Sequence, residues 1–163
     1  MKRIILLRHS KARRDIPDIA DIERPLSVKG INDASKMGVF FGKLNIFPDI
    51  VFCSPAVRAR MTSDYFFKQK KDFQIIFDKD IYYDCFGATL KIISNLKAEL
   101  NSVMIIGHNP DLLELTGYLT GAAFPFTKFS TTGIAVLETD STDWKKTPKN
   151  SCRLISFHSP RII

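Results

Sequence analysis

The chain has 163 residues, of which 45% are hydrophobic and 25% are charged, and its formal net charge is +7. This length predicts one folded domain over residues 1–163, and the composition excludes a disordered chain. No apolar run approaches the roughly 20 residues that span a bilayer. The apolar stretch 4–7 ends at charged residues and is too short for a signal peptide, so we expect a cytoplasmic protein without membrane association.

The net positive charge favours anionic ligands such as phosphates, acidic protein surfaces or nucleic acid. No recognised nucleic-acid-binding motif accompanies it, so nucleic acid is not the expected partner. Three cysteines, Cys53, Cys85 and Cys152, are widely spaced and odd in number. They predict buried thiols in a reducing compartment, and neither a disulfide framework nor a metal site. We therefore expect no metal and no other cofactor.

Short β-rich segments alternate along the chain with segments of helical periodicity, which predicts an α/β sheet with helices on its faces. The expected strands are 4–7, 50–53, 74–77, 103–106, 134–137 and 153–157. The expected helices begin after an N-cap at Ser27, run from 55 towards 68, include Leu90 to Leu100, and carry Leu112 to Leu119. Residues 15–25 read as a loop, and the polar stretch 138–150 joins the last two strands without an assignable structure.

Polar side chains follow three of these strands at their carboxyl ends, the edge at which open α/β sheets bind ligands. The first pair is Arg8 and His9, directly after the opening strand. An arginine can neutralise phosphate oxygens while a neutral imidazole nitrogen attacks phosphorus. Nearby cations also lower the pKa of a histidine and so keep its ring unprotonated.

The second and third strands of interest are each followed by a polar residue and then a proline. Ser54 is predicted to cap a helix that starts at Pro55, which places Arg58 in the first turn, where its guanidinium can reach the free N–H groups. Asn109 is predicted to cap the helix after Pro110 and to hold His108 at the helix start. Two histidines and two arginines at one sheet edge suit phosphoryl transfer, which needs positioning and neutralisation of charge.

These motifs resemble those of the histidine phosphatase superfamily, which includes the phosphoglycerate mutases. The blocks at residues 6–11, 23–30, 54–62 and 107–112 occur in family order, and the Arg-Pro-Leu-Ser block at 24–27 and the His-Asn-Pro block at 108–110 resemble the SixA-type phosphohistidine phosphatases. The resemblance implies a three-layer α/β/α sandwich with a mostly parallel central sheet, phosphoglycerate mutase-like, without a lid subdomain. It also implies that His9 is the phosphorylated nucleophile, and that Arg8, Arg58 and His108 grip the phosphoryl group.

Two positions depart from the family pattern. Ser10 follows the nucleophile where glycine or alanine is common, which predicts a tighter pocket floor. No acid that could protonate an alkoxide leaving group is evident, since Asp84 reads better as a surface carboxylate. The stretch 78–88 is too short for a lid, so we expect an open pocket with a rim of Lys11, Arg13 and Arg14.

The main hypothesis is therefore a metal-independent phosphatase that forms a phosphohistidine intermediate and favours phosphohistidine on a partner protein. An imidazole leaving group needs less help from an acid than an alkoxide does. Two alternatives stay open from the sequence. One is the same mechanism on a small phosphoester such as a sugar phosphate or nucleotide, and the other is a non-catalytic phosphate-binding module.

Overall fold

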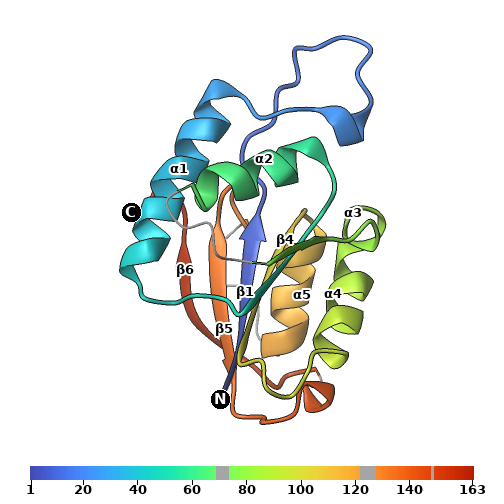
Figure 1. Cartoon of the computed structure of the whole chain (residues 1–163), viewed down its shortest axis with the longest axis vertical. Helices are drawn as coiled ribbons and strands as arrows, with labels where there is room; N and C mark the ends of the chain where they lie inside the picture. The colour runs from blue at the N-terminus through green and yellow to red at the C-terminus, as the bar shows by residue number, and fades with distance from the viewer. Residues whose placement is uncertain (69–73, 122–127, 148) are drawn as a thin grey trace.

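The computed structural model describes residues 1–68, 74–121, 128–147 and 149–163, and these build one six-stranded sheet in the order β3-β2-β4-β1-β5-β6 (Figure 1). The strands are β1 (Lys2–Arg8), β2 (Ile50–Cys53), β3 (Ile75–Phe77), β4 (Ser102–Gly107), β5 (Ile134–Thr139) and β6 (Arg153–His158). β1, β2, β3 and β4 pair in parallel, whereas β5 pairs antiparallel with both β1 and β6. The sheet is therefore mostly parallel, and the predicted antiparallel pair at the end of the chain is confirmed.

Helices cover both faces of the sheet because alternate side chains of β1 point to opposite sides. Ile5 and Leu7 share one apolar cluster with the buried side chains of α1 (Val28–Lys43) and α2 (Val57–Phe66). Ile4 and Leu6 belong to the other cluster, together with α3 (Asp80–Tyr83), α4 (Cys85–Ser94) and α5 (Asp111–Thr120). The expected three-layer α/β/α architecture is confirmed.

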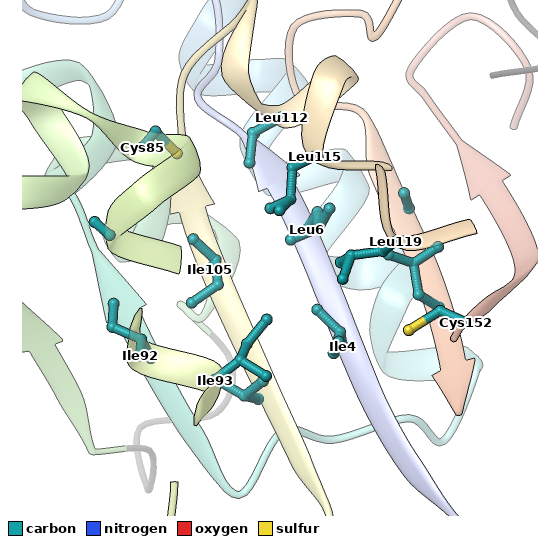
Figure 2. Packing of buried hydrophobic residues seen from close by; sticks show 14 of the residues in the cluster. Ile4, Leu6, Cys85, Ile92, Ile93, Ile105, Leu112, Leu115, Leu119 and Cys152 are labelled. Carbon is teal, nitrogen blue, oxygen red and sulfur yellow. The ribbon is translucent and has the colours of Figure 1, made fainter. Parts of the chain in front are cut away.

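The second cluster forms a continuous apolar layer under α4 and α5 (Figure 2). Leu112, Leu115 and Leu119 project from α5 onto Ile4 and Leu6 of β1. All five side chains are fully buried, and full burial of a leucine or isoleucine stabilises a fold by about 1.5–3 kcal/mol. This packing holds α5 against β1, and the parallel pairing of β1 with β4 aligns the carboxyl ends of the two strands. The three cysteines are buried and free, as the sequence predicts.

Three predicted helix boundaries are wrong. Ser27 does cap α1, since its side chain accepts a hydrogen bond from the Gly30 N–H. However, α2 and α5 begin at Val57 and Asp111, after Ala56 and Pro110, rather than directly after the predicted caps. The helix expected over Leu90 to Leu100 begins further upstream, because Asp84 caps α4 by accepting from Gly87 N at 2.8 Å.

Short helical turns lie in the expected loop 15–25 and in the stretch 138–150, to which the sequence assigns no structure. Residues Asp21–Glu23 form a 3₁₀ turn inside the expected 15–25 loop. Within the stretch 138–150, of which residue 148 lies outside the described part, a second 3₁₀ turn covers Trp144–Lys146. Trp144 is buried and donates from Nε1 to the Leu100 carbonyl at 2.9 Å. This stretch therefore supplies a core residue as well as a connection.

No helical subdomain is inserted above the sheet edge within the described ranges, in agreement with the expected absence of a lid. The stretch 78–88 holds only α3 and the first turn of α4. Among the same residues, no helix is long and apolar enough to cross a membrane.

Candidate active site

The carboxyl ends of three adjacent strands meet at one point of the sheet edge. β1 and β4 are neighbours in a register that pairs Arg8 with Gly107, so His9 and His108 leave the sheet side by side, with ring centroids 5.1 Å apart. β2 lies on the other side of β4, and α2, the helix that follows β2, carries Arg58. The topology thus brings together the four side chains that the sequence singled out.

His9 is held in one tautomer by its own loop. Its Nδ1 lies 2.8 Å from the Ser10 carbonyl oxygen, which can only accept a hydrogen bond. Nδ1 must therefore carry the proton, and the neutral ring keeps its lone pair on Nε2. The backbone N–H of His9 donates to Gly107 O at 3.1 Å, which ties this loop to the end of β4.

The site keeps both histidines uncharged near neutral pH. Burial lowers the pKa of His9 to about 3, and the charges of His108, Arg58 and Arg8 act in the same direction, against the hydrogen bond to Ser10, which raises it. Burial likewise lowers the pKa of His108 to about 4, helped by Arg58 and Arg8 and opposed by the negative charge of Asp21. A nitrogen with a free lone pair is what a nucleophile at this place requires.

The ring of His108 is positioned by Ser54, while its backbone carbonyl accepts from the Leu112 N–H at the start of α5, at 3.1 Å. Its Nε2 lies 2.8 Å from Ser54 Oγ, and the same hydroxyl accepts from the Ala56 N–H at 3.3 Å. Ser54 is fully buried and is thus a polar link between the ends of β2 and β4. The capping role predicted for Ser54 is wrong, because α2 begins at Val57 and the Ser54 hydroxyl is shared with His108.

Asn109 also has a different partner from the predicted one. Its Nδ2 donates to the Phe129 carbonyl at 3.0 Å, and Arg8 Nη1 donates to the same oxygen at 2.7 Å. The Asn109 side chain therefore joins the end of β4 to the segment before β5 and does not cap α5.

Arg58 is buried in the first turn of α2. It extends to the 3₁₀ turn, where Nη1 donates to the Asp21 carbonyl at 2.6 Å and Nη2 to the Asp21 carboxylate at 2.9 Å. The same carboxylate accepts from the Tyr82 hydroxyl at 3.0 Å and pairs with Arg24 at 2.8 Å. Tyr82 in turn packs edge-on against His108, with ring centroids 5.7 Å apart.

Asp21 and Tyr82 are the site residues that sequence reasoning missed. Asp21 lies 37 residues before Arg58, and only its place three residues ahead of the Arg-Pro-Leu-Ser block could have drawn attention to it. Burial alone would raise the pKa of Asp21, but Arg58, the Tyr82 hydroxyl and Arg24 outweigh it and hold that pKa below its usual value. Asp21 is therefore an ionised carboxylate that fixes Arg58, and not a proton donor at neutral pH.

Two buried donors at this edge have no hydrogen-bond partner among the described residues. The Nε atoms of Arg8 and Arg58 are hidden from solvent and make no hydrogen bond among the described residues. Buried N–H groups are costly when unpaired, and a charged one most of all. A bound phosphoryl group would bring acceptor oxygens to both guanidinium groups, which suit planar, bidentate recognition of such oxygens.

Three buried hydroxyl side chains, those of Ser10, Thr62 and Thr132, lie at or beside the residue that follows His9. Ser10 Oγ is 2.7 Å from Thr132 Oγ1, and the Ser10 N–H donates to Thr62 Oγ1 at 2.9 Å. Thr62 in turn donates to the Arg58 carbonyl at 2.6 Å. The Ser10 side chain thus binds Thr132 and is fully buried, so it does not form the tighter pocket floor that the sequence suggested.

Asp84 has a structural role, as the sequence favoured. It is exposed and its carboxylate caps α4. No group of three or more His, Cys, Asp or Glu side chains within the described ranges is arranged to hold a metal ion.

The expected basic rim lies on one side of His9. Lys11, Arg13 and Arg14 line a cleft of about 870 Å³ together with Arg8 and His9. We call it the basic cleft; its further walls are residues 12, 15, 24, 27, 29, 33, 128, 130, 131, 160 and 161.

Known proteins are similar to this chain in sequence and in fold. The chain is 31% identical to an uncharacterized protein of Mycobacterium leprae, over 95% of the chain and 100% of that relative. A protein of Agrobacterium tumefaciens assigned as the phosphohistidine phosphatase SixA is 29% identical, with a TM-score of 0.84 and 98% of both chains covered. A SixA structure from Nakamurella multipartitia gives a TM-score of 0.83 at 22% identity, over 98% of this chain and 96% of that one. No family model matches the chain.

The chain has the fold of the histidine phosphatase superfamily, to which these structural neighbours belong. More distant members share the fold alone, such as an alpha-ribazole-5'-P phosphatase from Escherichia coli with a TM-score of 0.71 at 14% identity and full coverage of both chains. Structural neighbours of the chain with TM-scores of 0.82 to 0.84 carry the SixA name, the name of the branch that the sequence motifs resemble. The resemblance inferred from the sequence motifs is confirmed.

Proposed function

We propose that this protein is a phosphatase that transfers a phosphoryl group to Nε2 of His9, and that its favoured substrate is phosphohistidine on a partner protein. The observation that carries the proposal is the state of His9. Its Nδ1–H is bound to the Ser10 carbonyl, so Nε2 keeps its lone pair, and the ring lies beside His108 within the electrostatic field of Arg58 and Arg8.

In the first step, the Nε2 lone pair attacks phosphorus and a P–N bond to His9 forms. The bond between phosphorus and the substrate imidazole breaks, and its electron pair stays on the leaving nitrogen, which takes a proton from solvent. Arg8 and Arg58 neutralise the phosphoryl oxygens during this transfer, and His108 holds one of them from the neighbouring strand end. Such preorganised donors are the main source of catalysis in phosphoryl transfer.

In the second step, a water molecule attacks phosphorus and the P–Nε2 bond breaks. The electron pair returns to His9, the water protons pass to phosphate and solvent, and inorganic phosphate leaves. The ring is then again neutral, with Nδ1 bound to Ser10. Because the two arginines already supply positive charge, we propose that neither step needs a metal ion.

The contacts of the two nearby carboxylates support phosphohistidine over an alkyl phosphate. An alkoxide leaving group needs a proton donor, yet Asp84 caps α4 and Asp21 is ionised and bound to Arg58. An imidazole leaves without such help. The open sheet edge also admits a side chain presented on a protein surface.

The test is to trap the intermediate with a labelled phosphohistidine protein. We expect a phosphoenzyme that is labile in acid and stable in base, and that is absent in His9→Ala. His108→Ala should form it more slowly while keeping its far-UV spectrum. His158→Asn is the matched control, because His158 is the third histidine of the chain and packs on Phe40 of α1. A wild-type rate in His9→Ala would refute the mechanism.

The same protein should be compared with sugar phosphates and nucleotides by kcat/KM. A small ester that exceeds the phosphohistidine protein would replace the proposed substrate by the small-phosphoester alternative. Absence of turnover with every substrate, an aryl phosphate included, would leave a phosphate-binding module.

A further inference from the structure

The net charge of the protein is concentrated in the basic cleft. Eight of the 24 lysine and arginine residues of the chain line it, against two of the 17 acidic residues, Asp15 and Asp33. The remaining sequence has 16 basic and 15 acidic residues and is almost neutral. A cleft next to the candidate nucleophile therefore carries +6 of the formal +7.

Five of these eight cations have no carboxylate partner among the described residues. Arg13 pairs with Asp15, Lys29 with Asp33, and Arg24 with Asp21, while Arg8 donates to a carbonyl. The unpaired cations are Lys11, Arg14, Lys128 and Arg161, and all four are exposed and make no ion pair with the described residues. Burial lowers the pKa of Arg8 most, and the positive charge of Arg14 lowers it further. The positive field of the cleft therefore reaches a residue that is expected to bind the phosphoryl group.

The cleft extends from His9 in one direction. Its walls come from the loop after β1, the start of α1, the segment 128–131 and the C-terminal residues 160–161. Arg58, Tyr82 and His108 do not line it. A ligand that places its phosphoryl group at His9 and fills the cleft therefore runs along α1 towards Arg161.

The charge is too large and too spread out for a phosphoryl group alone. Arg8 and Arg58 suffice to neutralise the transferred group, so the unpaired cations need further anionic groups along the cleft. A protein segment rich in aspartate and glutamate supplies them at intervals of one residue. Among the described residues, no phenylalanine, tyrosine or tryptophan lines the cleft, whereas proteins that bind single-stranded nucleic acid stack bases on aromatic side chains.

We propose that the basic cleft is a docking groove for an acidic segment of the phosphorylated partner protein, next to the phosphorylated side chain. This proposal rests on the proposed function, since it assumes that the phosphoryl group binds at His9. Lys11, Arg14 and Arg161 hold carboxylates of the segment, and Lys128 closes the groove from the opposite wall. Such complementary charge speeds association and selects the partner, and salt weakens both effects.

The test compares two peptides that carry one phosphohistidine, one flanked by glutamate and the other by glutamine. At low ionic strength we expect the wild type to favour the acidic peptide about tenfold or more in kcat/KM, within the range of electrostatic steering. This ratio should fall towards one in the variant Lys11→Glu/Arg14→Glu/Arg161→Glu, and also in the wild type at 0.5 M salt.

The matched control is Lys68→Glu/Lys97→Glu/Lys145→Glu, which reverses three exposed lysines outside the cleft and changes the net charge equally. The control should keep the wild-type ratio. The docking proposal would be overturned if the cleft variant also kept the wild-type preference for the acidic peptide. It would equally be overturned if the control variant lost that preference to the same degree.

A binding measurement separates this proposal from the proposed function. The glutamate peptide without its phosphoryl group should bind the wild type by fluorescence anisotropy and bind the cleft variant at least about tenfold more weakly. Loss of all turnover with this binding intact would refute the phosphatase and retain the groove. An oligonucleotide that binds more tightly than the acidic peptide at 0.15 M salt would assign the cleft to nucleic acid instead.

Discussion

Removing the Thr132 hydroxyl should weaken both the fold and the nucleophile loop. Thr132 has a left-handed backbone, with φ of 58°, a strained conformation for a β-branched residue. Its N–H donates to the carbonyls of Arg8 and His9, at 3.1 and 3.3 Å, and its hydroxyl lies 2.7 Å from Ser10 Oγ. The substitution Thr132→Val keeps the shape and the backbone bonds and removes only the hydroxyl.

The expected magnitude follows from the burial of this pair. Both side chains are fully buried, so the valine leaves the Ser10 hydroxyl without a partner, at a cost of about 1–3 kcal/mol in the free energy of unfolding. Because the Ser10 carbonyl fixes Nδ1 of His9, we also expect kcat to fall on the order of tenfold with little change in KM. Urea unfolding and steady-state hydrolysis of an aryl phosphate measure the two effects.

A double-mutant cycle makes the prediction specific. The variant Ser10→Ala/Thr132→Val removes both hydroxyl groups, leaves no buried group unpaired, and should be more stable than the sum of the single losses implies. A loss below about 0.5 kcal/mol in Thr132→Val, or strict additivity in the cycle, would refute the argument that the pair is coupled.

Four further predictions concern the charged groups of the site. Arg58→Lys should lower kcat/KM by roughly 10²-fold, since a lysine cannot reproduce the planar fork, and a loss under threefold would place Arg58 outside the pocket. Asp21→Asn should raise KM for an aryl phosphate several-fold more than it lowers kcat, because Arg58 loses its ionic partner but keeps its bond to the Asp21 carbonyl. Equal effects on both constants would argue against a role of Asp21 in positioning Arg58. The pKa of His108 is lowered to about 4, so between pH 6.5 and pH 4 the unfolded chain takes up a proton that the folded chain does not. The contribution of His108 to the free energy of unfolding is therefore fully present above about pH 6.5 and is lost as the pH falls towards 4. Denaturant unfolding at pH 7 and pH 5 should show a smaller acid loss in His108→Asn than in the wild type, by on the order of 1–2 kcal/mol. Activity should survive EDTA, and complete loss that Mg²⁺ restores would contradict charge neutralisation by arginine alone.

Most of the fold was predictable because its signals are local. Apolar β-rich runs and helical spacing located all six strands and both faces of the sheet, and the Ser27 cap fixed the start of α1. The expected caps at Ser54 and Asn109 failed because both side chains bond to groups distant in sequence, His108 and Phe129. Local capping rules do not account for such competition.

The site was predictable in part for the same reason. Arg8, His9, Arg58 and His108 each stand at or after a strand end, and parallel neighbours bring such ends together; their roles remain predictions. Asp21 could not be found this way, because its contact with Arg58 depends on how the loop 15–25 folds back over α2. Arg161 joins the basic cleft only because β6 returns the chain to that side.

The place of β1 in the sheet also bears on how the protein folds during synthesis. β1 is the first strand to leave the ribosome, but its two neighbours are β4, which starts at Ser102, and β5, which starts at Ile134. The apolar run Ile4 to Leu7 therefore stays unpaired until β4 and β5 have been synthesised. Contacts of such high sequence separation slow folding and leave unpaired strands open to aggregation. We expect the edge that carries His9 and His108 to assemble late, and refolding yields to depend on protecting this first strand.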